Sequence, residues 1–178
     1  DPSAVEMIAR IDYDFSRFDD AHGTLLGIAI RTEIFDEKTR AFIDQHPDGL
    51  IVNIAAGLDT RFKRVDNGQI AWVDLDLPLG MTFRRQFVEP DTRQTFIDAD
   101  ILNFAWIDAL PRTEGQAVLL IIEGLLMYFE EAQVRELLTT LTERLAPATV
   151  LLEVTGVTMS KRTDRQEGVN KTGARFKW

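Results

Sequence analysis

Residues 50–61, LIVNIAAGLDTR, join a short apolar run to a turn of small residues, and this stretch decides the fold. Leu50–Ala56 is expected to be a buried strand, because it is apolar and follows the turn signal Pro47-Asp48-Gly49. A helix is expected to open after the turn at Gly57. Doubly wound α/β folds bind their nucleotide cofactor at such a turn, beyond the carboxyl end of the first strand. The stretch therefore predicts an α/β domain with a cofactor site at residues 55–61.

Four further strands are predicted by apolar runs that alternate with helical patterns. The run VLLIIE is the strongest of them, and the run that begins at Gln94 is the weakest. The expected strands are Ile70–Leu75, Gln94–Ile97, Val118–Glu123 and Thr149–Val154. Continuously apolar strands are typical of parallel sheets whose two faces are covered by helices. The predicted fold class is therefore α/β and Rossmann-like, with a mostly parallel sheet and helices on both faces.

Helical patterns flank these strands. Residues 130–145 place leucines and a valine on one stripe and carry acidic residues in the first turn, which is the pattern of an amphipathic helix. Residues 33–45 form an expected helix that leads into the first strand, and residues 1–30 an extension that is partly helical. We divide the chain into an N-terminal helical extension on the substrate side, residues 1–45, and a cofactor-binding core, residues 46–178.

Composition restricts the partners and the compartment. The net charge of −9 disfavours nucleic acid and acidic membrane surfaces, since both are bound through clustered Lys and Arg. The longest apolar run, Ala117–Ile122, is far shorter than the roughly 20 residues of a membrane-spanning helix. The chain has no cysteine, and its N-terminus lacks the pattern of a signal peptide. We therefore expect a small-molecule partner, no nucleic acid, no membrane, and a cytoplasmic location.

An acid follows the Gly57 turn at the distance typical of a ribose-binding residue. Asp76 ends the second expected strand, nineteen residues after Gly57, and a carboxylate accepts two adjacent hydroxyl hydrogen bonds. Asp74 lies on the same face if side chains alternate, so both acids are candidates. The turn lacks the pattern G-x-G-x-x-G that a pyrophosphate requires. A cofactor without phosphate, such as S-adenosylmethionine with its sulfonium and amino-acid groups, fits the turn better than a dinucleotide.

Several segments occur in an order and at a spacing that together form a specific pattern. They are Ile30-Arg31-Thr32-Glu33 with Asp36, Val52–Arg61, Trp72–Pro78, Asp98–Leu102, Trp106–Leu110 and Glu123–Phe129. In this combination the chain resembles the leucine carboxyl methyltransferase and polyketide O-methyltransferase family of class I S-adenosylmethionine-dependent enzymes. The resemblance spans residues 30–145, and the tail Asp164–Trp178 is similar to the polyketide branch. It implies an S-adenosylmethionine-dependent O-methyltransferase that acts on a carboxylate or hydroxyl of a small molecule, polyketide-like or another secondary metabolite.

The resemblance also implies which residues bind the amino-acid part of the cofactor. Arg31 would pair with the methionine carboxylate, a bond suited to a guanidinium fork. Ala55 and Gly57 would approach the amino-acid part through backbone atoms. Glu123, at the end of the strongest strand, would bind the methionine amino group or lie near the reacting centre. A carboxylate there is hard to explain structurally, because the strand before it is entirely apolar.

A second group of residues is implied to bind the nucleoside and the acceptor. Asp76 would hold the ribose hydroxyls, with Asp74 as the alternative. Asp100 and Ile101 would frame the adenine with a polar contact and an apolar wall. Tyr128 is the candidate catalytic residue, which would orient the acceptor or line the sulfonium pocket. Packing beneath a loop is an equally good interpretation of this tyrosine.

The chain departs from the family pattern in two ways. The family often has glycine where this chain has Ala55, which leaves less room for the cofactor. Class I methyltransferases usually have seven strands that end in an antiparallel hairpin, and the sequence predicts five. The C-terminal hairpin is therefore expected to be missing from this chain, and the core to be truncated.

The sequence offers no strong general base and no metal site. His22 and His46 are the two histidines, and they lack the spacing of metal ligands. This favours an acidic acceptor or catalysis by positioning alone. Two alternatives remain: an NAD-dependent oxidoreductase, which shares the fold and the ribose acid, and a non-catalytic relative that retains only the cofactor-binding fold.

Overall fold

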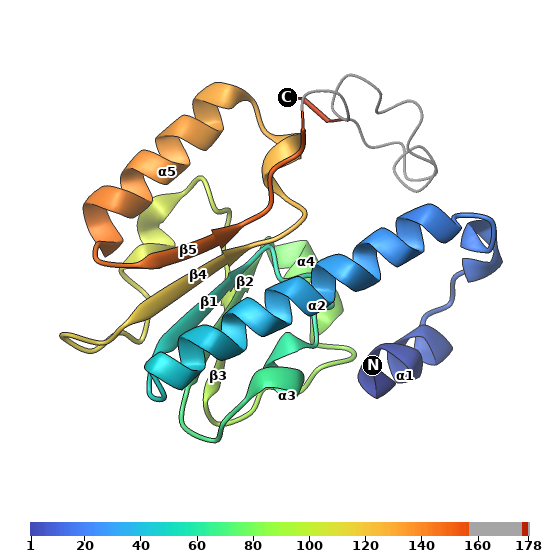
Figure 1. Ribbon diagram of the computed structural model, residues 1–178, viewed down its shortest axis with the longest axis horizontal. Coiled ribbons are helices and arrows are strands. Elements are labelled where there is room, and N and C mark those ends of the chain that lie inside the picture. Colours follow the sequence, from blue (N-terminus) through green and yellow to red (C-terminus); the bar gives the residue numbers. More distant parts are fainter. Residues whose placement is uncertain (157–175, 178) are drawn as a thin grey trace.

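Five parallel strands form the centre of the molecule, as the computed structural model shows for residues 1–156 and 176–177, the part of the chain that it describes. Their order is β3-β2-β1-β4-β5 (Figure 1). Every pairing is parallel. The strands are β1 (Leu50–Ile54), β2 (Ala71–Asp76), β3 (Gln94–Asp98), β4 (Val118–Ile122) and β5 (Thr149–Leu152). This confirms the predicted strands and the α/β Rossmann-like fold class.

The strand order creates a crevice at one edge of the sheet. From β1 the chain continues to β2 on one side, whereas β4 lies on the other side of β1. Connections that leave in opposite directions open a crevice at the carboxyl ends of the two strands, which is where open α/β sheets bind ligands. The carboxyl ends of β1 and β4 are therefore the place to examine for a site.

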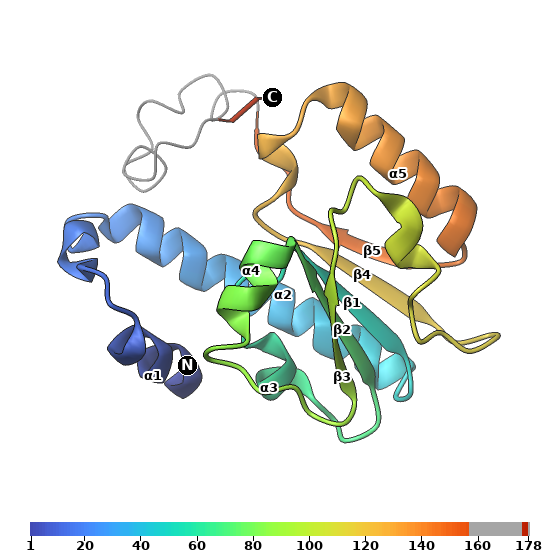
Figure 2. The same ribbon diagram turned by 180° about the vertical axis from the view of Figure 1, so that it is seen from behind.

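Helices cover both faces of the sheet because each central strand is apolar on both sides. On one face, α5 (Glu131–Leu145) and the 3-10 turn η2 (Phe104–Ile107) pack against alternate residues of β1, β2 and β4. On the other face, α2 (His22–Gln45) and α3 (Arg61–Val65) pack against the intervening residues. Figures 1 and 2 show α5 and α2 on opposite sides of the strands. The predicted amphipathic helix at 130–145 is confirmed, with Glu130 as its N-cap.

Helix α2 begins eleven residues earlier than predicted. The expected start at 33 was wrong, because residues 22–32 lack an amphipathic stripe but contain no proline and continue the same helix. Its N-terminal half extends beyond the sheet (Figure 1) and leaves Leu25, Leu26 and Ile28 exposed. Its C-terminal half packs on the sheet through residues 35–43. The division of the chain at 45/46 stays a prediction.

Two short helices precede α2. Helix α1 (Pro2–Arg10) is held at both ends: the Asp1 carboxylate accepts bonds from the Thr60 hydroxyl and from Arg64, and Arg10 donates to the Gln86 carbonyl at 2.6 Å. The turn η1 (Phe15–Phe18) then leads to α2. The N-terminal extension is thus partly helical, as predicted, and the bonds of Asp1 hold it beside α3.

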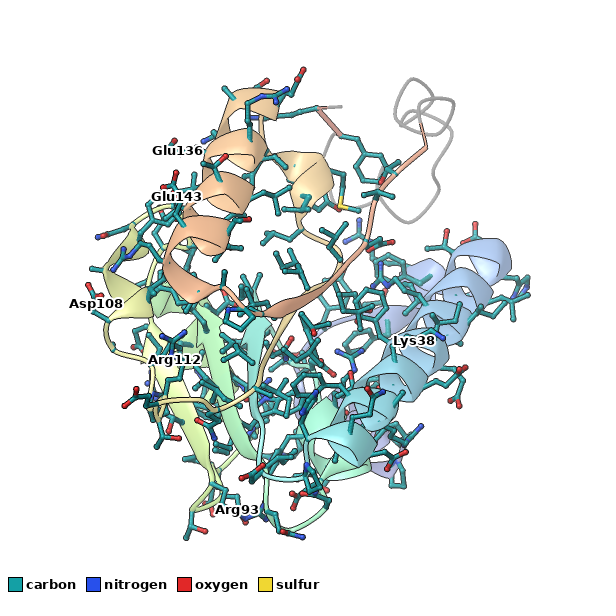
Figure 3. All side chains as sticks on the ribbon, turned by 60° about the vertical axis from the view of Figure 1, so that its left-hand side comes forward. Lys38, Arg93, Asp108, Arg112, Glu136 and Glu143 are labelled. Atoms are coloured by element: carbon teal, nitrogen blue, oxygen red, sulfur yellow. The ribbon has the colours of Figure 1, made fainter. Side chains whose placement is uncertain are left out.

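The remaining helix, α4 (Pro78–Arg84), follows β2 and contacts β2 and β3. A third short turn, η3 (Leu126–Tyr128), follows β4. Charged side chains such as Lys38, Asp108 and Glu143 point outward from the helices and loops (Figure 3). No helix among residues 1–156 is long and apolar enough to cross a membrane. The tail 164–178 that resembles the polyketide branch lies outside the described residues, except for 176–177.

Candidate active site

Strand alternation gathers polar side chains at the carboxyl edge of the sheet, on the face that α2 covers. On this face Ile51, Trp72 and Ile121 pack against α2 and α3. Two residues further along each strand, the same face carries Asn53, Asp74 and Glu123. The apolar core of this face thus changes to polar groups where the strands end, and this change defines the candidate site.

A cavity of about 240 Å³ lies at this place. Its walls come from α2, from the end of β1 with the turn that follows it, and from the residue after β4. The lining residues are Arg31, Thr32, Asn53, Ile54, Ala55, Ala56, Asp59, Arg61 and Glu123. Three of the predicted cofactor-binding residues, Arg31, Ala55 and Glu123, are therefore together in one cavity although they are far apart in the sequence.

Arg31 reaches from α2 to two carboxylates. Its Nε donates to Glu123 Oε1 at 2.7 Å, and its Nη1 donates to the Glu153 carboxylate at 3.1 and 3.3 Å. Glu153 Oε2 also accepts the Gly124 N–H at 2.7 Å. Gly124 has a φ of +65°, a left-handed conformation that glycine adopts without strain, and the Arg31 guanidinium lies beside it. Arg31 is thus held at the cavity wall by the acids that directly follow β4 and β5.

Arg61 is the most buried charge of the cavity and was not assigned a role from the sequence. Its side chain is 1% exposed and contacts three carboxylates. Nε donates to Asp36 at 2.7 Å, Nη1 to Asp59 at 2.6 Å, and Nη2 to Glu123 Oε2 at 2.6 Å. Through Arg61 the start of α3 is joined to α2 and to the end of β4. Glu123 therefore receives one guanidinium on each oxygen.

Asp36 is a buried carboxylate on α2 that joins the same network. Besides Arg61 it accepts bonds from Arg64, at 2.6 Å from Nε and 3.0 Å from Nη2. Burial alone would raise the pKa of Asp36, but the hydrogen bonds from Arg64 and Arg61 outweigh burial and hold the pKa below its ordinary value. Asp36 is therefore ionised in the folded protein at neutral pH.

We expect Asp36→Asn to lower stability at neutral pH and to weaken its pH dependence in acid. Because the pKa of Asp36 is lower in the folded than in the unfolded chain, its contribution is complete above about pH 5 and is lost as the pH falls through the folded-state pKa. The variant should lose about 1.5–3 kcal/mol of unfolding free energy at pH 7 and less at pH 3. Denaturant unfolding at several pH values measures this, with Asp44→Asn on the exposed side of α2 as control. An unchanged difference between variant and wild type from pH 7 to pH 3 would contradict it.

The turn after β1 has the left-handed backbone that the glycine-rich turns of this fold require. Gly57 has a φ of +48°, and a Cβ there would meet nothing within 4 Å, so the space beside it is open. Ala55 has a φ of +56°, a conformation that costs a residue with a Cβ roughly 1 kcal/mol. A glycine at this position would adopt the same conformation without that cost. The alanine at position 55 therefore adds strain to the turn.

Asp76 and Asp74 have different surroundings, although they lie on one face of β2. Asp76, half-buried at the end of the strand, accepts the Gly57 N–H and the Leu77 N–H, each at 2.7 Å. Asp74 is 0% exposed, and its carboxylate is surrounded by four side-chain donors. Burial raises the pKa of Asp74 despite its contact with Arg84. The geometry thus leaves Asp76, beside Gly57, as the acid with access to a ligand.

Five predicted site residues are not among those that line the cavity. Two of them, Gly57 and Asp76, lie at the turn after β1 described above, and the other three lie elsewhere. Asp100 is exposed in the loop after β3, where its carboxylate accepts the Leu102 N–H at 2.9 Å. The Ile101 side chain is buried in the core beneath α5. Tyr128 is half-buried in η3, 5.6 Å from the ring of Phe176, and burial raises its pKa above the ordinary value. Their assigned roles stay predictions.

The sequence contained partial signals for the residues that were missed. Asp36, Asp59 and Arg61 all lie within the quoted motifs but were given no role. Glu153 lies near the end of the predicted apolar strand Thr149–Val154, much as Glu123 ends the predicted strand Val118–Glu123. Only the network of contacts shows that these residues act together. Within residues 1–156 and 176–177, no group of three or more His, Asp or Glu is placed to hold a metal ion.

Two solved structures share the fold of this chain. The N-methyltransferase NodS from Bradyrhizobium japonicum WM9 matches with a TM-score of 0.54 and 13% identity, over 77% of this chain and 75% of that chain. The S-adenosylmethionine-dependent methyltransferase SibL matches with a TM-score of 0.52 and 15% identity, over 79% and 43%. The chain has the Rossmann-like fold of class I methyltransferases. A family model described as leucine carboxyl methyltransferase matches residues 5–142. The chain belongs to this family, whose members are S-adenosylmethionine-dependent methyltransferases.

A curated relative agrees with this assignment. The tetracenomycin polyketide synthesis O-methyltransferase TcmP of Streptomyces glaucescens is 30% identical over 179 aligned residues. The alignment covers 100% of this chain and 66% of the relative, so the chain spans slightly less than two thirds of that protein. The suspected family is confirmed, and the alternative of an NAD-dependent oxidoreductase is set aside.

Proposed function

We propose that this chain binds S-adenosylmethionine and forms the cofactor-binding part of an O-methyltransferase that acts on a small-molecule carboxylate or hydroxyl. The observation that carries the proposal is the meeting of Arg31 and Glu123 at one cavity, beside the left-handed turn at Gly57. The family assignment supports the reaction type. The relative named for tetracenomycin polyketide synthesis supports a polyketide-like acceptor.

The donor set fits the amino-acid end of S-adenosylmethionine. That end carries a carboxylate and an ammonium group, and the cavity offers a guanidinium from Arg31 and a carboxylate from Glu123. Each carboxylate oxygen has a second lone pair, so Glu123 can accept from an ammonium while it keeps its arginines. The carboxylates of Asp59 and Glu123 at the cavity suit the positive sulfonium.

The nucleoside half would lie outside the cavity, on the side of Asp76. A cavity of about 240 Å³ is smaller than the roughly 300–1,000 Å³ typical of small-molecule sites, so it would hold the amino-acid end alone. The ribose hydroxyls would face the Asp76 carboxylate at the end of β2. Asp100 and Ile101 follow the neighbouring strand β3 and would frame the adenine.

The residues of the chain would act mainly by positioning. When bound, the cofactor supplies an electrophilic methyl group, and a carboxylate acceptor then needs no base. Tyr128 has a pKa raised by burial, so it stays protonated near neutral pH and would orient an acceptor as a hydroxyl donor rather than remove a proton. His46 follows α2, at the edge of the sheet opposite the cavity, and His22 is exposed. The described residues thus favour an acidic acceptor.

Calorimetric titration tests the proposal. We expect S-adenosylmethionine and its demethylated product S-adenosylhomocysteine to bind with micromolar dissociation constants, which correspond to about 8 kcal/mol of binding free energy. NAD should not bind, because the turn lacks the glycines that a pyrophosphate requires. Failure of both nucleoside ligands to bind at millimolar concentration would contradict the proposal and favour a non-catalytic relative of the fold.

A further inference from the structure

A fully buried carboxylate below the cofactor turn organises four donors around it. Asp74 accepts from Asn53 at 3.0 Å and from Trp72 Nε1 at 2.9 Å on one oxygen. On the other oxygen it accepts from Arg84 at 2.8 Å and from Gln94 at 2.7 Å. Four bonds fill the lone-pair sites of a carboxylate, so Asp74 has no capacity left for a ligand.

Arg84 connects the hydrogen-bond network around Asp74 on β2 to the cofactor turn at Gly57. It lies on α4, is 1% exposed, and uses its two terminal nitrogens in different directions: Nη2 toward Asp74 and Nη1 toward the Gly57 carbonyl at 2.9 Å. Its guanidinium also lies 5.2 Å from the centre of the Phe96 ring. A planar fork with fixed angles between its donors is well suited to hold two acceptors at once.

The burial of Arg84 is not explained by stability alone. Its Nε is buried and has no hydrogen-bond partner among the described residues. An unsatisfied buried donor costs stability, and buried charge pairs are often no more stabilising than apolar residues of the same size. The bond from Arg84 Nη1 to the Gly57 carbonyl is a contact that an apolar residue of the same size could not make.

The same carboxylate also supports the far end of the turn. Asn53 donates one amide hydrogen bond to Asp74 and another, at 3.2 Å, to Asp59. Gly57 is therefore fixed on both sides, its N–H by Asp76 and its C=O by Arg84, while Asp59 is fixed through Asn53. The backbone of residues 57–59 is thus held by one buried cluster centred on Asp74.

We propose that Arg84 is a positioning residue for cofactor binding, which fixes the Gly57 peptide through its ion pair with the buried Asp74. The proposal rests on the proposed function, because it concerns the same site. Holding the turn in its binding conformation before the ligand arrives removes an ordering cost that the ligand would otherwise bear. Since Gly57 follows the cavity residues Ala55 and Ala56, the effect concerns the amino-acid part of the cofactor more than the adenosine part.

Arg84→Lys separates positioning from folding. Lysine keeps a positive charge for Asp74, but an ammonium on a flexible stem lacks the fork that reaches both Asp74 and Gly57. The variant would be titrated with S-adenosylhomocysteine and with 5′-methylthioadenosine, a nucleoside that lacks the amino-acid part. We expect the first to bind roughly ten-fold more weakly and the second less than roughly two-fold more weakly. Arg85→Lys is the matched control, since Arg85 is exposed and pairs with Asp98 at the surface.

The outcomes are distinguishable. If Arg84→Lys does not fold, the double variant Asp74→Asn/Arg84→Gln removes both buried charges and, with a shorter side chain, still loses the Gly57 contact. Equal weakening of both ligands, or no weakening, would overturn the positioning role in either variant. If the wild-type protein binds neither ligand, the proposed function and the role of Arg84 are both refuted. If the wild type binds both ligands and the variants bind them equally well, only the positioning role of Arg84 is refuted.

Discussion

Replacing Arg61 by methionine is expected to lower the free energy of unfolding by about 3–5 kcal/mol, the cost of leaving buried carboxylates without their partner. Arg61 is 1% exposed and is the only residue that contacts Asp36, Asp59 and Glu123 together among those described. Methionine fills similar space but offers no donor. Arg64 and Arg31 still contact Asp36 and Glu123, so we expect destabilisation rather than complete unfolding.

Denaturant unfolding of the wild type and Arg61→Met measures this effect. The control is Arg135→Met, which removes an ion pair with Glu131 on the exposed side of α5 and should change stability by less than about 0.5 kcal/mol. A loss below about 1 kcal/mol for Arg61→Met would show that the three acids do not depend on this arginine. The proposed arrangement of Glu123 would then lack its support.

The second large effect is expected on cofactor affinity. Asp76→Ala should weaken the binding of S-adenosylmethionine by about a hundred-fold, or roughly 3 kcal/mol, because charge-assisted bonds to both ribose hydroxyls are lost. The variant also removes the acceptor of the Gly57 N–H. Asp76→Asn keeps one acceptor oxygen and should weaken binding by about ten-fold.

The loss of affinity for three different ligands shows which contact the variant has removed. The ribose is common to S-adenosylmethionine, S-adenosylhomocysteine and 5′-methylthioadenosine, so Asp76→Ala should weaken all three alike, unlike Arg84→Lys. Asp108→Asn is the control, since this exposed acid pairs with Arg144 and neither residue lines the cavity. Unchanged calorimetric affinity in Asp76→Ala would show that Asp76 does not bind the ribose and that another residue does.

Some features of the molecule follow from its sequence because their causes are local. The continuous apolar runs predict the strands since both sheet faces are buried, and the stripe on residues 130–145 predicts α5. The Gly57 turn and the acid nineteen residues later predict where the ligand-binding edge of the sheet lies. The start of α2 could not be predicted, because its first turns lie beyond the sheet and show no amphipathic pattern.

The tertiary structure decided what each charged residue does. In sequence Asp74 and Asp76 are equivalent acids on one face, and only the four donors around Asp74 show that it is structural. Arg31, Arg61 and Glu123 come from three elements, and their contacts exist only because α2 crosses the ends of β1 and β4. A local pattern reflects burial along one element, whereas an ion pair depends on the packing of several. The sequence by itself therefore determined the fold and the edge that carries the site, and the tertiary structure decided which acids remain open to a ligand.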